Sequence, residues 1–144
     1  MRKVFTGGAF DLLHYAHVLF LEECAKHGDY LVVEVNSDAR VKHKKGPSRP
    51  ILPEEDRMAI VGALRCVDEV VTRSGESDYP VFKTLTEVKP DVCVINVDEF
   101  ADYSELEEFC QWNNIELVKI PRIIAPSGLD TSKIVEKIKK GTKW

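Results

Sequence analysis

Short apolar segments rich in β-branched residues alternate along this chain with longer segments whose apolar residues recur at helical spacing. Strands are predicted at residues 4–6, 30–35, 69–72, 92–96 and 116–120. Helical spacing joins Val18, Leu21 and Ala25, then Ile60, Val61 and Leu64, then Val81, Leu85 and Val88, then Leu106, Phe109 and Cys110. Such alternation predicts right-handed crossovers and a parallel sheet covered by helices on both faces. The expected fold is α/β: a three-layer, doubly wound, five-stranded parallel sheet of the Rossmann-like type.

A single domain over residues 1–144 is expected, because no repeat, low-complexity segment or linker divides the chain. Pro53 before three acidic residues predicts a helix start, as does Asp78 before a Tyr-Pro pair. The one long irregular stretch is predicted at residues 37–52. Doubly wound sheets bind ligands beyond the carboxyl ends of their strands, so residues that directly follow strands should carry the chemistry.

Composition and charge limit the classes of partner and cellular location that are expected for this chain. Apolar residues make up 44% and charged residues 31% of the chain, as in globular proteins. The 20 basic and 24 acidic residues give a net charge of -4, so nucleic acid is not an expected partner. No apolar run approaches the roughly 20 residues that span a bilayer, and Asp11 and His14 come too early for a signal peptide. Widely spaced cysteines predict reduced core thiols of a cytoplasmic protein: Cys24, Cys66, Cys93 and Cys110.

The segment after the first predicted strand is the strongest candidate for a ligand site. Gly7 and Gly8 allow close backbone approach, and a helix pattern follows them. The segment lacks the glycine fingerprint of dinucleotide binding and the ending of a P-loop. His14 and His17 share one helical face, which predicts two converging donors for a phosphate. A surface pair, core histidines or half of a zinc site are the alternatives for these two residues.

This segment resembles a signature of the cytidylyltransferase-like nucleotidyltransferases. Gly8-Ala9-Phe10-Asp11-x-x-His14-x-x-His17 is similar to Gly-x-Phe-Asp-x-x-His-x-Gly-His, whose histidines bind nucleoside triphosphate phosphates. Ala16 replaces the usual second glycine of that signature. The resemblance implies catalytic roles for His14 and His17 and nucleotide contacts from Thr6, Gly8, Ala9, Phe10 and Asp11.

A basic segment follows the second predicted strand. Residues 40–49 carry five formal positive charges and no acid, which fits either a solvated surface loop or a mobile cationic flap over phosphates. Residues 35–38, 45–51, 53–58 and 63–68 resemble the ADP-heptose synthase adenylyltransferase domain. The resemblance implies that Lys45 is a catalytic lysine. Arg57 is a candidate acceptor contact, together with Asp11, or a structural anchor of its helix.

The segments that follow the last two predicted strands resemble the family less closely than the first segment does. Asp98 fits a Gly-x-Asp-aromatic segment that borders the nucleotide, although Asn96 replaces the glycine; a turn or a helix cap near Asp102 is the structural alternative. Arg122 and the later Thr131-Ser132 resemble the family's phosphate-binding Arg-Thr-x-Gly-Ile-Ser-Thr-Thr segment, with three extra residues between them. Asp130 replaces a serine of that segment and is either an N-cap or a group that repels phosphate unless Mg²⁺ or Arg122 offsets it.

Nucleotidyl transfer is the activity that the resemblance implies for this chain. A phosphate oxygen of a small acceptor would attack the α-phosphorus of ATP or CTP, with Mg²⁺ accompanying the triphosphate and no metal site made by the protein alone. A heptose-type sugar 1-phosphate with ATP is the first expectation, followed by glycerol 3-phosphate with CTP and by FMN adenylylation to FAD. A noncatalytic nucleotide sensor and a dinucleotide-dependent oxidoreductase are the alternatives from other classes. The resemblance also makes a homodimer the expected assembly.

Overall fold

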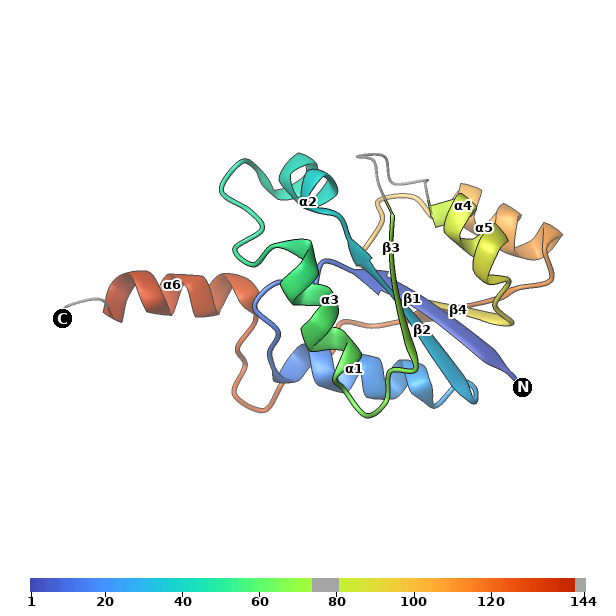
Figure 1. The fold of residues 1–144 in the computed structure, drawn as a ribbon, viewed down its shortest axis with the longest axis horizontal. Helices are drawn as coiled ribbons and strands as arrows, with labels where there is room; N and C mark the ends of the chain where they lie inside the picture. The colour runs from blue at the N-terminus through green and yellow to red at the C-terminus, as the bar shows by residue number, and fades with distance from the viewer. Residues whose placement is uncertain (74–80, 142–144) are drawn as a thin grey trace.

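The computed structural model describes residues 1–73 and 81–141, and the helix start predicted at Asp78 lies outside them. Five parallel strands lie side by side in the order β3-β2-β1-β4-β5 (Figure 1), which confirms the predicted fold class. The strands are β1 (Lys3–Gly8), β2 (Tyr30–Asn36), β3 (Glu69–Arg73), β4 (Val92–Asn96) and β5 (Glu116–Ile120). All five predicted strands are therefore present, and their register makes β1 the centre of the sheet.

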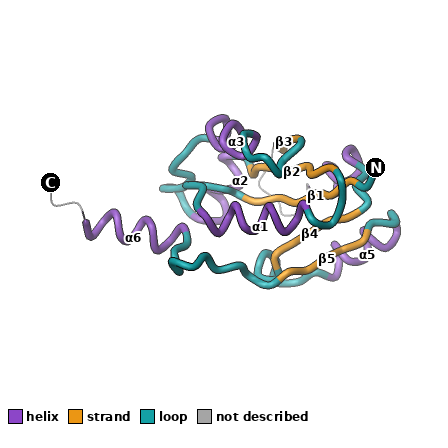
Figure 2. The backbone as a smooth tube through the Cα atoms, turned by 90° about the horizontal axis from the view of Figure 1, so that it is seen from below, coloured by secondary structure: helices purple, strands orange, loops and turns teal. Residues whose placement is uncertain are grey.

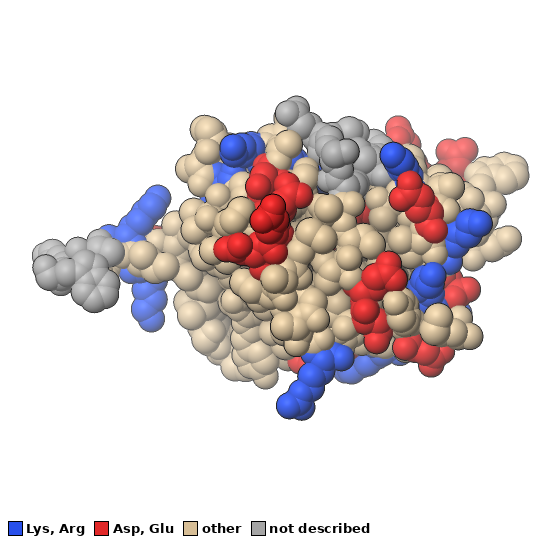
Figure 3. Space-filling model, viewed as in Figure 1, with Lys and Arg blue, Asp and Glu red and all other residues tan. Residues whose placement is uncertain are grey.

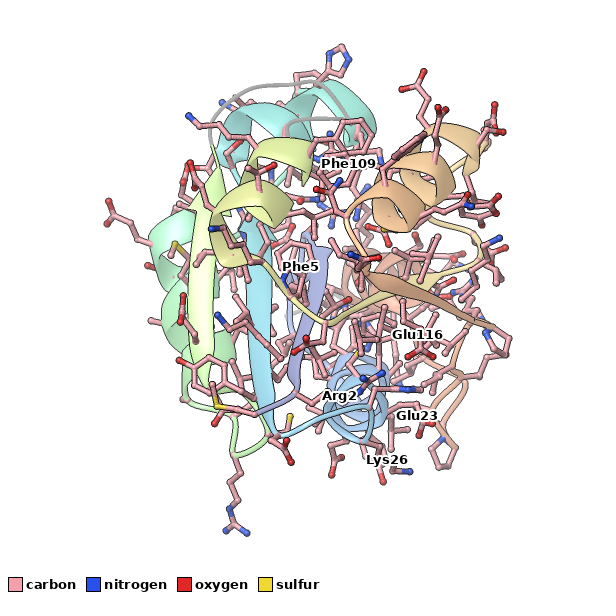
Figure 4. All side chains as sticks on the ribbon, turned by 90° about the vertical axis from the view of Figure 1, so that its right-hand side faces the viewer. Arg2, Phe5, Glu23, Lys26, Phe109 and Glu116 are labelled. Atoms are coloured by element: carbon pink, nitrogen blue, oxygen red, sulfur yellow. The ribbon has the colours of Figure 1, made fainter. Side chains whose placement is uncertain are left out.

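The described helices are α1 (Tyr15–Ala25), α2 (Asp38–Lys45), α3 (Glu54–Gly62), α4 (Val81–Val88), α5 (Ser104–Trp112) and α6 (Thr131–Gly141). Side chains of the strands alternate between two cores, since neighbouring positions of a strand point to opposite faces. Val4 of β1 belongs to the core that α1 and α3 cover, whereas Phe5 belongs to the core that α4 and α5 cover (Figure 4). The sheet is therefore the middle of three layers. Ile60, which was expected to face the sheet, is 39% exposed on α3.

The prediction of a long irregular stretch at residues 37–52 was wrong, because α2 occupies half of it. The Ser37 hydroxyl accepts a hydrogen bond from the backbone N–H of Arg40 and caps the helix. Asp38 lies in the first turn and four basic residues lie in the last turn, which suits the helix dipole at both ends. The helix stops at Gly46, whose φ of 99° lies in the region that glycine adopts most readily. The segment expected to be a flap is thus a short helix followed by a loop.

The chain order creates a crevice at the carboxyl ends of the strands. β1, β2 and β3 run outward on one side, and the chain then returns to place β4 on the other side of β1. Loops that leave β1 and β4 therefore diverge at their carboxyl ends, which is the ligand-binding position of doubly wound sheets. The start of α6 lies near this edge, while the rest of that helix projects away from the body (Figures 1 and 2).

Charge is unevenly distributed over the surface that Figure 3 shows. Basic side chains stand out on α6, and acidic side chains gather near the start of α3. The acidic residues of that first turn are Glu54, Glu55 and Asp56. Within residues 1–73 and 81–141, no helix has both the length and the apolar character needed to cross a bilayer.

The N-terminal residues bond to neighbouring segments at the opposite end of the sheet, where the strands begin. Arg2 forms an ion pair with Glu116 of β5 (Figure 4), and its carbonyl accepts hydrogen bonds from the N–H groups of Asp29 and Tyr30. Gly28 lies against this backbone. A Cβ atom at Gly28 would lie 2.5 Å from the Arg2 carbonyl oxygen and 2.7 Å from a methyl group of Val4.

Gly28→Ala should therefore destabilise the protein by about 1 to 3 kcal/mol, because the added methyl meets the Arg2 backbone and the fully buried side chain of Val4. Gly141→Ala is the matched control, since nothing lies within 4 Å of a Cβ there, and it should change the free energy of unfolding by less than about 0.5 kcal/mol. Urea denaturation measures both. Equal stability of the two variants would contradict the close approach at Gly28.

Candidate functional site

A cavity of about 640 Å³ lies at the carboxyl ends of β1 and β4. Its walls come from the loop after β1, the start of α1, the end of α2, the loop after β4 and the start of α6. It brings together most of the residues predicted from the sequence: Gly8, Ala9, Phe10, Asp11, His14, His17, Lys45, Asp98, Arg122, Thr131 and Ser132. Segments that are more than 100 residues apart in the chain thus meet in one place.

The two histidines form a stacked pair at the start of α1. Their ring centroids are 3.8 Å apart, and the backbone N–H of His14 donates to Nδ1 of His17 at 3.2 Å. Because Nδ1 of His17 is the acceptor, a neutral His17 carries its proton on Nε2. Phe10 packs edge-on against the same ring, with centroids 5.6 Å apart. The pair is therefore fixed in orientation before any ligand arrives.

Burial makes both histidines poor bases. Desolvation lowers the pKa of His17 to about 3, with His14 and Lys45 adding to the shift and Asp11 opposing it. Desolvation also lowers the pKa of His14, which Asp130 partly opposes. Both rings are thus neutral hydrogen-bonding groups at pH 7 in the free protein.

The start of α6 reaches the first histidine. Nε2 of His14 lies 3.0 Å from the Thr131 hydroxyl, which is also 3.5 Å from the Asp11 carbonyl oxygen. Nδ1 of His14 is buried without a hydrogen-bonding partner. This contact joins the N-terminal and C-terminal parts of the predicted site. It forms although the chain has three extra residues between Arg122 and Thr131.

Positive charge borders the cavity at the end of α2. Lys44 and Lys45 both line the wall. Desolvation and the neighbouring Arg49 lower the pKa of Lys45, while Asp11 opposes that shift. The end of α2 therefore brings two lysine side chains to the cavity wall, where an anionic ligand would meet them.

Asp11 lines the cavity, but its carboxylate is committed to the fold. One oxygen accepts from Arg49 Nε at 3.0 Å and from the Ile51 N–H at 2.7 Å, and the other accepts from the Leu52 N–H at 3.0 Å. Burial raises the pKa of Asp11, yet these donors together hold it below its usual value. The geometry favours a positioning role for Asp11 over the predicted contacts with nucleotide and acceptor.

Arg57 is an anchor, which was the structural alternative considered for it. Its side chain is completely buried and does not line the cavity. The guanidinium donates to the carbonyl oxygens of Ala9, Asn36 and Leu52 and to the Asp38 carboxylate, each at 2.8 Å. It thereby holds four segments together, and this arrangement does not support an acceptor contact.

One further prediction differs from the structure, and one structural alternative is excluded. Thr6 is fully buried, and its hydroxyl donates to the Val94 carbonyl within the sheet at 2.8 Å, so it does not reach the cavity. Asp98 lines the cavity and is not a helix cap, because α5 begins at Ser104 with Asp102 accepting from the Ser104 N–H. The side chain of Asn96 accepts from the Asp98 N–H and closes the turn in which a glycine was expected.

The cavity wall also includes residues for which no role was predicted from the sequence: Phe20, Asn36, Lys44, Glu99 and Ile123. Phe20 follows His17 by three positions on α1, so helical spacing places both on one face. Asn36 is the last residue of β2, where the strand-end rule applies equally. Ile123 carries no chemical signal of its own beside Arg122.

Backbone strain is concentrated in the loop after β1. Phe10 and Leu12 have φ values of 50° and 53°, a left-handed conformation that bulky side chains seldom adopt. Such strain persists where the surroundings fix it, and it gathers at functional loops. Here the fixed contacts are the hydrogen bonds of Ala9 and Asp11 with the segment at residues 49–57.

A family model described as cytidylyltransferase-like matches residues 5–138. This chain belongs to that family. It is an enzyme of the nucleotidyltransferase type, and its cavity occupies the position at which doubly wound sheets bind ligands.

Named relatives fall into two groups. The chain is 40% identical to a FAD synthase of Ferroglobus placidus, covering 96% of this chain and 88% of that protein. It is 42% identical to the bifunctional protein HldE of Azorhizobium caulinodans, covering 95% of this chain but 27% of that protein. The chain therefore spans about a quarter of the HldE relative. A lipopolysaccharide core biosynthesis protein from Thermoplasma volcanium has a similar structure, with a TM-score of 0.72, 34% identity and coverage of 85% of this chain and 98% of that one.

Low pH should weaken folding through His17. The ring is neutral in the folded state down to about pH 3, but it titrates near 6.5 when unfolded. Between these two pH values the unfolded state binds more protons than the folded state. The contribution of neutral His17 to the free energy of unfolding is therefore complete above pH 6.5 and is lost progressively as the pH falls toward 3.

Wild type should therefore lose about 1 to 2 kcal/mol more unfolding free energy between pH 7 and pH 5 than His17→Gln. Urea denaturation at the two pH values measures this difference. His27→Gln, at the other end of α1 and outside the cavity, should behave as the wild type does. Identical losses in wild type and His17→Gln would contradict a neutral, buried His17.

Proposed function

We propose that this enzyme transfers AMP from ATP to a phosphate of a small acceptor and releases pyrophosphate. The observation that carries the proposal is the meeting of two neutral histidines with the cationic end of α2 in one cavity at the carboxyl ends of β1 and β4. Neutral N–H donors, hydroxyls and lysines are what a triphosphate requires, and no side chain needs to act as a nucleophile.

The reaction balances without a covalent enzyme intermediate. A phosphate oxygen of the acceptor forms the new bond to the α-phosphorus of ATP, and the bond to the pyrophosphate oxygen breaks. Negative charge spreads over the nonbridging and leaving oxygens in the transition state, so fixed donors should contribute most of the rate enhancement.

Residues of this chain have distinct parts in that scheme. The backbone N–H groups of Gly8 and Ala9 would approach the phosphates, because Gly8 has no side chain and Ala9 has only a methyl group. His14 and His17 would donate hydrogen bonds to phosphate oxygens, with His17 using Nε2. Lys45 would neutralise charge at the reacting phosphates, and Arg122, Thr131 and Ser132 would complete the cavity wall beside His14.

Mg²⁺ fits the donor set of this site as a companion of the triphosphate. Within the described residues, no group of three or more His, Cys, Asp or Glu side chains is arranged to hold a metal by itself. Asp98 and Glu99 on the cavity wall supply carboxylate oxygens, the ligand type that Mg²⁺ prefers beside phosphates. The ion would offset triphosphate charge as a Lewis acid.

FMN is the first acceptor to test. The matched region makes up 88% of the Ferroglobus placidus FAD synthase and 91% of a second FAD synthase, from Thermococcus sibiricus, so the activity of those proteins resides largely in sequence that this chain shares. A heptose-type sugar 1-phosphate is the second acceptor, which the match to HldE supports. Both reactions join an AMP group to an existing phosphate, so they place the same demands on the donor site.

A pyrophosphate-release assay tests the proposal. ATP and CTP, each with Mg²⁺, would be crossed with FMN, heptose 1-phosphate and glycerol 3-phosphate. We expect turnover with ATP and FMN. Turnover with heptose 1-phosphate would retain the donor assignment and change the acceptor, and turnover with CTP alone would overturn the donor. Nucleotide binding without turnover on any acceptor would favour a sensor.

Single substitutions test the assigned roles. His14→Ala should lower kcat/KM by about 10²- to 10³-fold, the loss seen when a preorganised transition-state donor is removed. Lys45→Ala should have a comparable effect, whereas Lys42→Ala, on the same helix but outside the cavity, should not. His27→Ala controls for loss of a histidine. A folded His14→Ala or Lys45→Ala protein with full turnover would refute the corresponding role.

A further inference from the structure

Asp130 makes two contacts through its two carboxylate oxygens. Oδ2 accepts a hydrogen bond from Arg122 Nη2 at 2.6 Å, and Oδ1 accepts from the backbone N–H of Lys133 at 2.8 Å. Both Arg122 and Asp130 line the nucleotide cavity. The acceptance from Lys133, three residues on, is the geometry of a helix N-cap.

The cap sets where α6 begins, and therefore where Thr131 lies. The Thr131 hydroxyl is 3.0 Å from His14 Nε2, so the first residue of α6 contacts the first histidine directly. The second contact fixes a cation. Arg122 is 56% exposed, and its long side chain would otherwise sample many rotamers.

Capping alone does not explain an aspartate at this position. Ser, Thr, Asn and Asp cap helices about equally well, and a carboxylate beside a phosphate site is electrostatically unfavourable. What aspartate adds over serine is the charged partner for Arg122. A guanidinium has five N–H donors, so a bond from Nη2 leaves donors for a phosphate oxygen.

We propose that Asp130 is a positioning residue that holds Arg122 against the cavity and thereby strengthens the binding of the nucleotide phosphates. This inference rests on the proposed function, since it takes the cavity to be the triphosphate site. Asp130 acts through Arg122 and does not touch the reacting atoms. Its removal should therefore weaken nucleotide binding and leave the chemical step largely intact.

A double-mutant cycle with Asp130→Ser and Arg122→Gln tests the inference, because serine keeps the cap and loses the charge. The readouts are the Kd for Mg·ATP by calorimetry and the separate kcat and KM of turnover. Asp130→Ser should raise Kd and KM by up to about five-fold, the size that a solvent-exposed ion pair supports, with kcat within about two-fold of wild type. Arg122→Gln should weaken binding at least as much. The double variant should bind no more weakly than Arg122→Gln alone.

Three outcomes would overturn the inference: Asp130→Ser binding Mg·ATP as tightly as wild type or more tightly, Arg122→Gln binding unchanged, or additive losses in the double variant. Glu136→Gln is the matched control, because Glu136 pairs with Lys140 at 2.8 Å on the same helix and both side chains are exposed. It should change neither Kd nor kcat.

The result is distinguishable from failure of the proposed function. A wild-type protein that binds no Mg-nucleotide would overturn the proposed function and this inference together. A wild type that binds Mg·ATP but turns over no acceptor would count against the proposed reaction alone. The Kd values of the cycle would then still decide whether Asp130 acts through Arg122.

Discussion

Two buried ions hold the carboxyl edge of this sheet together. The Arg57 guanidinium donates to the loop after β1, the end of β2, the start of α2 and the segment before α3. The Asp11 carboxylate ties the same loop after β1 to residues 49–52. Burying an ion is costly, and only a full set of hydrogen bonds offsets that cost. The strained backbone at Phe10 and the placement of Lys45 both depend on these contacts, because they join the loops from which the cavity is built.

This arrangement separates the duties of charged and neutral groups. The hydrogen-bonding side chains at the start of α1 are neutral imidazoles, held at fixed angles by stacking and by the His14 N–H. The positive charge comes from α2, and Arg122 faces its carboxylate partner. A site of this kind binds an anion through oriented donors without concentrating unpaired positive charge in a buried space, which would destabilise the free protein.

Most of the fold could be predicted from the sequence, because alternating strand and helix periods leave few arrangements for an α/β chain. The glycine loop and both histidines could likewise be placed at the ligand edge, since the strand-end rule and helical spacing are local. The roles that the sequence left least determined belong to side chains whose contacts are distant in sequence. Arg57 and Asp11 have the residue types of a phosphate or acceptor site, but their partners lie 48 and up to 41 residues away, and no pattern in the chain shows those bonds. The family resemblance implied a nucleotide contact for Thr6, yet its hydroxyl bonds the neighbouring strand.

In the proposed reaction, the stacked neutral histidines are the phosphate-binding donors. Long-range ¹H–¹⁵N NMR of the histidine side chains, without and with Mg²⁺ and α,β-methylene-ATP, tests it directly. We predict that the Nε2 signals of His14 and His17 change on binding and that those of His27 and His43 do not, with His17 showing an Nε2-protonated neutral ring before the nucleotide is added. Saturating nucleotide that leaves the signals of His14 and His17 unchanged would contradict the account.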